Sequence, residues 1–236
     1  MKTNPKSLKA AHIKLVPILY KDDQYVVFDK PAGLLVIPTP QKEQRTLESI
    51  VNGYDIDKKE AKLYPCHRLD RDTSGAIIFA WGKNNQRRMM DLFKNRSVKK
   101  IYLAIAHGIL KKKSDQIKAV IKDFDAQKYH SKSKGRFAQT DYRVIGQGKE
   151  FSFLEVFPRT GRTNQIRIHL SQIGHPLVGE RKYAFAKDYL LKFRRTALHA
   201  HILECQNPIT GKMIKAKAPL PEDMEKFLLN YDYQGV

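Results

Sequence analysis

The most informative stretch of this chain is CHRLDRDTSG at residues 66–75, followed directly by AIIFA at residues 76–80. The first ten residues form the densest polar cluster of the sequence. The next five are apolar and include two β-branched residues, a pattern that predicts a buried strand. A polar loop that enters a core strand is held rigidly, so it can position side chains over a cleft. The sequence therefore predicts a functional loop at the edge of a hydrophobic core.

Asp70 is the candidate catalytic residue of this loop, since Arg68 and Arg71 flank it. Nearby cations favour the ionised form of a carboxyl group. An ionised and positioned carboxylate can act as a nucleophile or as a general base. The competing interpretation is structural, because Asp70, Thr73 and Ser74 could instead satisfy the amides of a turn. The residues of the loop alone leave both interpretations open.

The segments around this loop predict a fold with many strands and few helices. A short helix capped by Thr46 and a helix at 84–95 are expected. Thr163 is expected to cap a third helix with Ile166, Leu170 and Ile173 inward, which Gly174 ends, and a fourth lies at 221–229. Further strands are predicted at 25–29, 99–106, 117–121, 151–157, 198–205 and 213–218, the last two joined by a hairpin turn at 206–211. Because strands and helices do not alternate regularly, the pattern indicates an α+β fold.

The charge of the chain points to a polyanionic partner. Its 236 residues include 44 Lys and Arg against 24 Asp and Glu, which gives a formal net charge of +20. Nucleic acid is the commonest partner of such a protein, because phosphates attract cations and release counterions on binding. An anionic membrane surface is the alternative, but no long amphipathic helix with a bulky apolar face is present. Residues 1–16 carry four lysines and no acid, so we expect a basic arm there and one domain at 17–236.

Several other classes of protein are excluded or disfavoured. No apolar run approaches the roughly 18 residues of a membrane-spanning helix, and no signal-peptide pattern opens the chain, so we expect a cytoplasmic protein. Two cysteines cannot form a disulfide framework or a four-cysteine zinc site, and the eight histidines lack zinc-hydrolase spacing. Gly146 and Gly148 lack the third glycine of a dinucleotide-binding loop. We therefore expect neither a metal nor a nucleotide cofactor.

Several segments, taken together and in order, resemble the RluA-type pseudouridine synthases. HRLDRDTSG at 67–75 matches the highly specific HRLDxxTSG signature of that family. KPAGLLV at 30–36 is similar to its first motif, and KIYLA at 100–104 to its tyrosine motif. GRTNQIRIHL at 161–170, with GHPL at 174–177, is similar to the third motif, and LHA at 198–200 and PITG at 208–211 to the closing segment. The resemblance covers about residues 20–230 and outweighs the structural interpretation of Asp70.

Two positions depart from the family pattern. Asn164 stands where the family usually has histidine, and Asp29 precedes the first motif where asparagine is common. Asparagine and histidine both donate and accept hydrogen bonds, so the change at Asn164 bears on substrate fit rather than on activity. Few residues precede the predicted domain, so the resemblance is to the shorter, single-domain members.

The resemblance implies a single mixed, mostly antiparallel curved sheet with flanking helices and a central basic cleft. It also implies an isomerase that breaks the bond between ribose and uracil, turns the base and rejoins it through carbon 5, without cofactor or metal. Asp70 would be the catalytic carboxylate, attacking the sugar or the base or taking a ribose proton. Arg167 would pair with Asp70 and keep it ionised, and Tyr102 would stack on the target uracil. Leu198 would line the pocket.

RNA contacts are expected from the residues around this pocket. Arg68 would fill the gap that the flipped uridine leaves in its stack. The stretch at 128–136 is predicted to be a mobile loop that grips RNA. The full set of expected RNA-binding residues is Arg68, Arg71, Lys128, Lys132, Lys134, Arg136, Arg162 and Asn164.

Two functions from different classes follow from the sequence. The first is a monomeric enzyme that modifies transfer RNA, large-subunit ribosomal RNA, or both. The second is a basic RNA-binding protein, such as a ribosome-assembly factor, that kept the fold without the chemistry. The combination of Asp70, Tyr102 and Arg167 favours the enzyme, and a nuclease is a distant third for want of metal ligands or paired histidines.

Overall fold

The predicted core strand is β4 (Ser74–Trp81), and all eight of its residues are buried. The computed structural model describes residues 16–41, 43–53, 61–121, 135–184, 191–231 and 233–235. Strand β4 starts immediately after the polar loop and is paired with β2 (Tyr25–Lys30) and β3 (Leu63–Pro65). The loop at 66–73 therefore opens directly into the centre of the sheet, as the sequence predicts.

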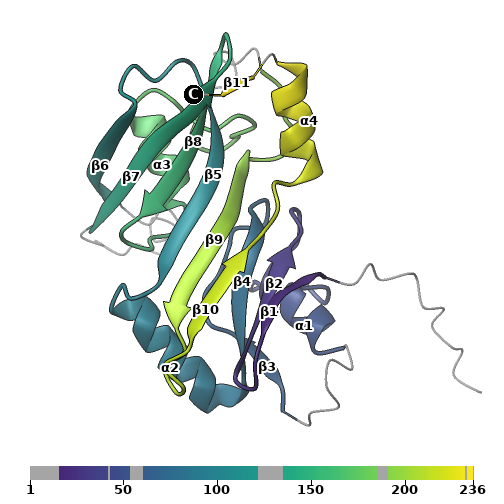
Figure 1. Ribbon diagram of the computed structural model, residues 1–236. Helices are drawn as coiled ribbons and strands as arrows, with labels where there is room; N and C mark the ends of the chain where they lie inside the picture. Colours follow the sequence, from purple (N-terminus) through teal and green to yellow (C-terminus); the bar gives the residue numbers. More distant parts are fainter. Residues whose placement is uncertain are drawn as a thin grey trace, which may run out of the picture.

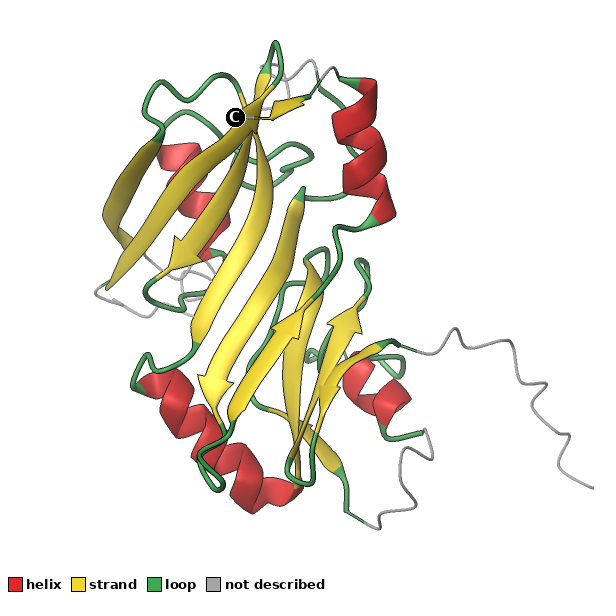
Figure 2. Ribbon diagram, in the orientation of Figure 1, coloured by secondary structure: helices red, strands yellow, loops and turns green. Residues whose placement is uncertain are grey.

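One sheet of eleven strands contains all the described strands, and it curves along the length of the molecule (Figures 1 and 2). Its path is β1-β2-β4-β9-β5-β8-β7-β11, with β10 beside β9, β3 beside β4 and β6 beside β7. Among the described strands only β4 and β9 run parallel, and they pair Ser74 with His199 and Gly75 with Ala200. The remaining strands are β1 (Ile18–Lys21), β5 (Lys99–His107), β6 (Ser114–Ile121), β7 (Arg136–Gln147), β8 (Phe151–Pro158), β9 (Leu198–Gln206), β10 (Met213–Lys217) and β11 (Gln234–Gly235).

Helices cover both faces of the sheet. Helix α1 (Leu47–Val51) packs against one face of β2 and β4, and α2 (Gly82–Lys94) packs against the other. Helix α3 (Gln165–Gln172) covers the face that Ala104 and Leu154 share, whereas α4 (Glu222–Asn230) covers the face of Ile105 and Phe153. Because side chains alternate along a strand, the neighbouring residues of β5 and β8 serve two separate cores. This confirms the predicted mixed α+β fold.

Two helices begin differently from one another. Thr46 caps α1 as predicted: its hydroxyl accepts a hydrogen bond from the Ser49 amide, and the Ser49 hydroxyl accepts one from the Thr46 amide. The prediction that Thr163 caps α3 is wrong. The residue before α3 is Asn164, which has left-handed backbone angles (φ 54°) and makes no side-chain cap. The side-chain amide of Asn164 instead makes hydrogen bonds with residues of the functional site.

The end of α3 follows the predicted pattern with one exception. Gly174 has φ +80°, its amide donates to Ser171 and the His175 amide donates to Leu170, which is a Schellman motif. Ile166 and Leu170 are buried, but Ile173 is 38% exposed, so the prediction that it points inward is wrong. Ile173 lies at the C-cap, beyond the last helical turn, where the apolar face of the helix no longer continues.

Four of the described strands were not predicted from the sequence, namely β1, β3, β7 and β11. The predicted basic arm lies outside the described residues except for Val16, and so does most of the predicted RNA-gripping loop, including Lys128, Lys132 and Lys134. Arg136, the last residue of that loop, is the exposed first residue of β7. Within the described ranges, no helix has both the length and the apolar character that spanning a bilayer requires.

Candidate active site

A cavity of about 1160 Å³ lies beside the loop that precedes β4. Three segments line it: residues 67–73, the corner between α2 and β5 at 93–102, and the stretch from Phe157 to Arg167. The cavity contains the three predicted catalytic residues Asp70, Tyr102 and Arg167. Of the other predicted site residues, it is also lined by Arg68, Arg162, Asn164 and Leu198, whereas Arg71 and Arg136 lie outside the lining. Residues far apart in the sequence are thus brought to one hollow.

The loop of Asp70 is held by its main chain, and Lys30 makes the most contacts. The Lys30 side chain is completely buried, and its Nζ donates to the carbonyl oxygens of Pro31, Leu34 and Arg71 at 2.8–3.0 Å. The Gly33 amide also donates to the Arg71 carbonyl at 2.9 Å. Burial lowers the pKa of Lys30 to about 7, and the charges of Asp72 and Asp70 act in the opposite direction. Three acceptors around one nitrogen match the three donors of an ammonium group.

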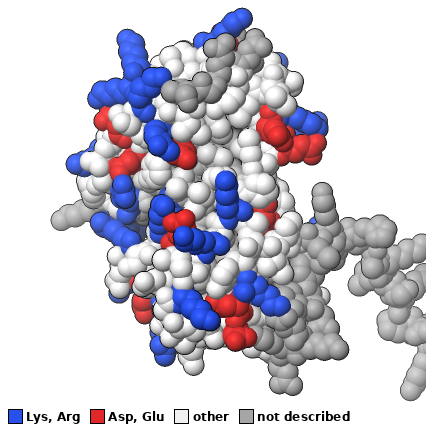
Figure 3. Space-filling view, in the orientation of Figure 1, with Lys and Arg blue, Asp and Glu red and all other residues white. Residues whose placement is uncertain are grey.

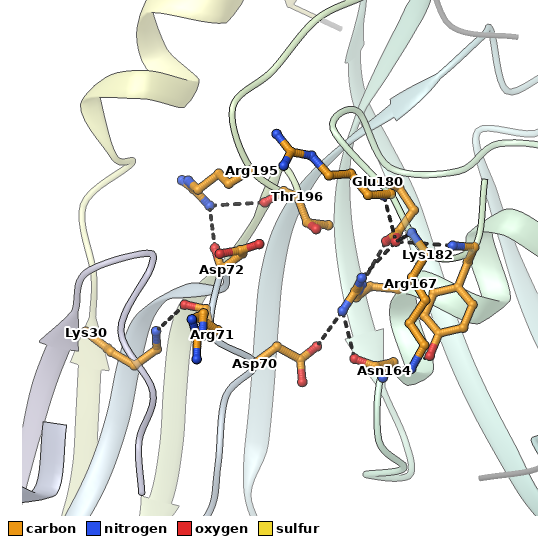
Figure 4. Close-up of polar contacts among 12 residues, drawn as sticks. Lys30, Asp70, Arg71, Asp72, Asn164, Arg167, Glu180, Lys182, Arg195 and Thr196 are labelled. Atoms are coloured by element: carbon orange, nitrogen blue, oxygen red, sulfur yellow. Dashed lines mark hydrogen bonds and ion pairs between the residues drawn. The ribbon is translucent and has the colours of Figure 1, made fainter. Parts of the chain in front are cut away.

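A second buried cation holds the same loop one residue further along. Arg195 is 7% exposed, and its Nη1 donates to the carbonyl oxygen of Asp72 at 3.1 Å. Its Nε and Nη2 pair with Asp223 of α4. Figure 4 shows Lys30 and Arg195 reaching the loop from one side, while Asp70 points away from them. The loop is thereby fixed without any contact to the carboxylate of Asp70.

The ends of the loop are also fixed. The ring of His67 stacks on Phe93 with centroids 4.6 Å apart, and its Nε2 accepts from the Ile78 amide at 3.2 Å. Burial lowers the pKa of His67 to about 3, so the ring is neutral and can accept that bond. At the other end, a Cβ on Gly75 would lie 2.2 Å from the Ala200 carbonyl oxygen. Only glycine allows β4 and β9 to approach so closely at φ +107°.

Asp70 faces Arg167 across the cavity. Its Oδ2 lies 3.6 Å from Arg167 Nη1, and its side chain keeps 26% of its surface exposed. Desolvation in the cavity raises the pKa of Asp70, and the opposing effects of Arg167 and Arg68 do not cancel it. Neighbouring cations do favour the ionised form of Asp70, as expected, but this is the smaller effect. The loss of water around the carboxylate raises its pKa by more than the two arginines lower it.

Arg167 makes its strongest pair with a residue that sequence reasoning did not identify. Its Nε and Nη2 donate to the two oxygens of Glu180, each at 2.7 Å, and the Glu180 side chain is fully buried. Glu180 Oε1 also accepts from the amides of Arg181, Lys182 and Tyr183. Burial acts to raise the pKa of Glu180, but the hydrogen bonds from Arg167 and from the Lys182 amide lower it overall. The two-pronged arginine–carboxylate pair of this site is therefore with Glu180, and the contact with Asp70 is single.

Asn164 completes this arrangement. Its Oδ1 accepts from Arg167 Nη1 at 2.8 Å, and its Nδ2 donates to the Tyr183 hydroxyl at 2.9 Å. The guanidinium of Arg167 also lies over the Tyr183 ring, 5.2 Å from its centroid. Figure 4 shows Arg167 enclosed by Asp70, Asn164 and Glu180. Asn164, which was expected to bind RNA, thus contacts the guanidinium that faces Asp70.

Tyr102 and Leu198 belong to the apolar part of the cavity lining. Tyr102 is half-buried between two cores, and burial together with Asp70 raises the pKa of its hydroxyl. Leu198 is 4% exposed at the start of β9. An aromatic ring and a leucine beside a carboxylate provide a surface on which a flat, partly polar base can lie.

The predicted RNA-binding arginines differ in their surroundings. Arg68 is exposed at the cavity, whereas Arg162 is half-buried and donates from Nε to the Phe137 carbonyl at 3.3 Å. Arg71 is exposed outside the cavity and pairs with Glu43. Figure 3 shows Lys and Arg side chains spread over one face of the molecule with acidic side chains among them. In the lining of the cavity the balance is different, since its one carboxylate, Asp70, is accompanied by eight Lys and Arg residues.

Little in the described residues resembles a metal site. A group of three or more His, Cys, Asp or Glu side chains that could hold an ion does not occur in those ranges. His199 and His201 both approach the Ala218 carbonyl, and His199 also bonds Ser74, so each has a partner in the sheet.

Comparison with known proteins shows which protein family has these residues. The profile of the family described as RNA pseudouridylate synthase matches residues 24–172, which include the loop of Asp70, Tyr102 and Arg167. The chain belongs to this family. It is 36% identical over 90% of its length to an uncharacterized RNA pseudouridine synthase of Chlorobaculum parvum, covering 73% of that protein. It is 35% identical over 87% of its length to the ribosomal large subunit pseudouridine synthase D of Pseudomonas aeruginosa, covering 68% of it.

The fold of this pseudouridine synthase is shared with a solved human structure. The human RNA pseudouridylate synthase domain containing 4 superposes with a TM-score of 0.75 over 92% of this chain and 93% of that one, at 24% identity. The family assignment confirms the predicted enzyme class, an RNA-modifying isomerase, and favours it over a protein that only binds RNA.

Two positioning residues of the site were missed by sequence reasoning. Glu180 carries a weak signal, since it is an acid followed directly by Arg181 and Lys182. Lys30 was recognised only as the first residue of a family motif, without a role of its own. Its burial follows from the pairing of β2 with β4, which places it opposite Gly75.

Proposed function

We propose that Asp70 is the catalytic carboxylate of this synthase and that the target uridine is flipped into the cavity beside it. The supporting observation is the placement of Asp70: its loop is held by main-chain contacts, and within the described part of the chain its carboxylate has one partner, at 3.6 Å. Because the contacts that hold the loop do not involve the carboxylate, this group is available to act on a substrate.

The roles of the surrounding residues follow from their positions. Arg167 orients Asp70 and offsets part of its charge, and Tyr102 and Leu198 hold the base. The glycosidic bond to the ring nitrogen breaks, the base turns, and carbon 5 bonds to the ribose; the proton on carbon 5 is lost and the ring nitrogen gains one. The raised pKa of Tyr102 keeps its hydroxyl protonated, so it can donate to the base or carry a proton.

For the RNA, we propose large-subunit ribosomal RNA, with transfer RNA as the second candidate. Support comes from the relatives named ribosomal large subunit pseudouridine synthase D, of which the protein from Xanthomonas campestris is 33% identical over 89% of this chain. We further propose that the enzyme acts as a monomer in the cytoplasm, with one catalytic domain at 17–236 preceded by a basic arm, and without metal or cofactor.

A tritium-release assay tests this proposal. Unmodified large-subunit ribosomal RNA and transfer RNA are transcribed with uridine tritiated at carbon 5, and the tritium released to water is measured in the presence of a chelator. Release from ribosomal RNA, with pseudouridine mapped at defined positions, is the expected result. Release from transfer RNA alone would correct the substrate, and no release from either RNA would refute the proposed activity.

A further inference from the structure

The cavity is lined along one side by the corner between α2 and β5. Residues 93–100 run past it, and every one except Asn95 is part of the lining. This corner carries four cations within seven residues: Lys94, Arg96, Lys99 and Lys100. The sequence predicts that this segment is the end of a helix and the start of a strand, with Lys100 opening the tyrosine motif, and assigns its cations no role.

Three of these cations have no acidic partner among the residues that the structure describes. Lys99 pairs with Glu204 at 2.9 Å, but no ion pair joins Lys94, Arg96 or Lys100 to a carboxylate in those ranges. Lys100 is half-buried, and the loss of water around its ammonium lowers its pKa. A cation that is partly desolvated and left without a counter-charge in a cavity favours an anionic ligand.

The backbone of Arg96 provides an independent observation. The Arg96 amide donates to Phe93 and the Ser97 amide donates to Leu92, so Arg96 occupies the position that follows the C-cap in a Schellman motif. Its φ is 60°, in the left-handed region. The equivalent position after α3 is Gly174, with φ +80° and the same two hydrogen bonds. A large side chain at the first position is therefore strained where the same protein uses glycine at the second.

Helix electrostatics explain this arginine only in part. Cations near a helix C-terminus interact favourably with the helix dipole, but Lys94 already stands in the last turn of α2. Backbone strain that is kept at an exposed residue beside the cavity points to a functional requirement for the side chain of that residue.

The size of the cavity leaves room for more than one base. Its volume of about 1160 Å³ exceeds the range of about 300–1000 Å³ that encloses a drug-sized ligand. Asp70, Tyr102 and Leu198 occupy only part of the lining, and the corner at 94–100 is a separate basic part. A single RNA strand that carries a flipped uridine must lead its flanking phosphates out of the cavity past such a surface.

We propose that Lys94, Arg96 and Lys100 form a phosphate-binding surface for the RNA strand next to the flipped uridine. The proposal rests on the proposed function for the identity of the ligand. It assigns the strain at Arg96 to RNA binding, so stability and affinity are opposed at this residue.

The substitution Arg96→Gly tests that opposition. Glycine relieves the left-handed strain, so the melting temperature is expected to rise by about 2–4 °C. One lost phosphate contact at about 0.15 M salt is expected to weaken RNA binding about fourfold and to reduce the slope of log Kd against log salt by about 0.7. Binding is measured by fluorescence anisotropy with labelled oligouridylate, in an Asp70→Asn background that prevents turnover.

Lys100→Gln and Arg87→Gln complete the design. Lys100→Gln is expected to weaken binding about fourfold, and the double variant with Arg96→Gly about fifteenfold. Arg87 is exposed on the same helix but does not line the cavity, so Arg87→Gln removes the same charge as a matched control. With tritiated ribosomal RNA, the Arg96 and Lys100 variants are expected to raise KM more than they lower kcat.

The outcomes separate this proposal from the proposed function. Unchanged affinity and salt slope in Arg96→Gly and Lys100→Gln would overturn it, as would an equal loss in Arg87→Gln, which would indicate a general effect of charge. Competition by polyglutamate as effective as by RNA would also overturn it, because the surface would then accept any polyanion. If wild type releases no tritium while RNA binding depends on Arg96 and Lys100, the phosphate site stands and the proposed function fails.

Discussion

The loop of Asp70 and the turn at 180–183 both contact Arg167 but are held in opposite ways. Buried Lys30 and Arg195 hold the loop by its carbonyl oxygens, and among the described residues the side chain of Asp70 has no bond beyond its contact with Arg167. The turn at 180–183 is held by a side chain, since Glu180 accepts from Arg167 and from three successive amides.

The pKa values of the two carboxylates shift in opposite directions for the same reason. Both face Arg167, yet the pKa of Asp70 is raised and the pKa of Glu180 is lowered. Desolvation affects both groups, but only Glu180 has enough donors to reverse it. Because the loop at 66–73 is fixed through its backbone, the carboxylate of Asp70 is available for chemistry. The turn at 180–183 is fixed through the carboxylate of Glu180, which is therefore needed for structure.

Asp70→Asn is the substitution with the largest expected effect. Activity should fall at least about 10³-fold, because an amide is neither a nucleophile nor a base at neutral pH. Folding should be retained, and RNA binding should be equal or tighter because a negative charge near phosphates is removed. Tritium release and filter binding measure the two effects.

Stability provides a further test of the same variant. A folded-state pKa above the unfolded one means that ionised Asp70 costs stability once the pH exceeds the folded value. Asp70→Asn should therefore melt at a higher temperature than wild type at neutral pH, and the difference should vanish in acid. An unfolded Asp70→Asn protein would instead make Asp70 a structural turn residue, and a fully active one would remove it from the reaction.

Lys30→Met should have the next largest effect, this time on folding. It leaves the carbonyls of Pro31 and Leu34 without their donor and removes one of two donors to Arg71, so we expect a loss of about 2–4 kcal/mol of unfolding free energy. Lys118→Met, at an exposed position of β6, is the control and should change stability by less than about 0.5 kcal/mol. Equal urea midpoints for the two variants would show that the loop does not depend on Lys30.

The contrast between the two regions also explains what the sequence could predict. Local patterns suffice where one segment determines its own structure: the apolar run at 76–80 is a buried strand, and Thr46 caps its helix. They fail where a distant partner decides. Asn164, rather than Thr163, precedes α3, and its side chain bonds the distant Tyr183 as well as Arg167 instead of capping the helix.

The site shows the same division. Asp70, Tyr102 and Arg167 carry motif signals and do share a cavity. Glu180 and the buried contacts of Lys30 depend on tertiary packing that no local spacing encodes. The pKa of Asp70 is the clearest case, because sequence neighbours reveal its cations but not the water that the folded cavity removes.

Arg167→Lys should lower activity about 100-fold and also destabilise the fold. Lysine keeps the charge, but one ammonium cannot replace the two bonds to Glu180 together with the contacts to Asn164 and Asp70. Arg143→Lys is the matched control, because Arg143 pairs with Glu155 at an exposed position outside the cavity. It should leave both the tritium-release rate and the melting temperature nearly unchanged. Near-normal turnover in Arg167→Lys would mean that the planar guanidinium does not position Asp70.

Glu180→Gln should have the smallest effect on the reaction rate, and its main effect should be on the pH dependence of kcat/KM. Glu180 adds to the raised pKa of Asp70 through its negative charge, and it occupies two of the donors of Arg167. Replacing it with a neutral side chain should therefore move the acid limb of kcat/KM to lower pH, because Asp70 must be ionised and becomes easier to ionise.

The stability of the Glu180→Gln protein tests independently whether the pKa of Glu180 is lowered in the folded state. A carboxylate with a depressed folded pKa contributes stability above its ordinary pKa and loses it as the pH falls through the folded value. Wild type should accordingly lose melting temperature on acidification more steeply than Glu180→Gln, with Glu150→Gln as the exposed control. An acid limb that stays in place or moves to higher pH would show that Asp70 does not sense Glu180, and the two carboxylates would then be independent despite sharing an arginine.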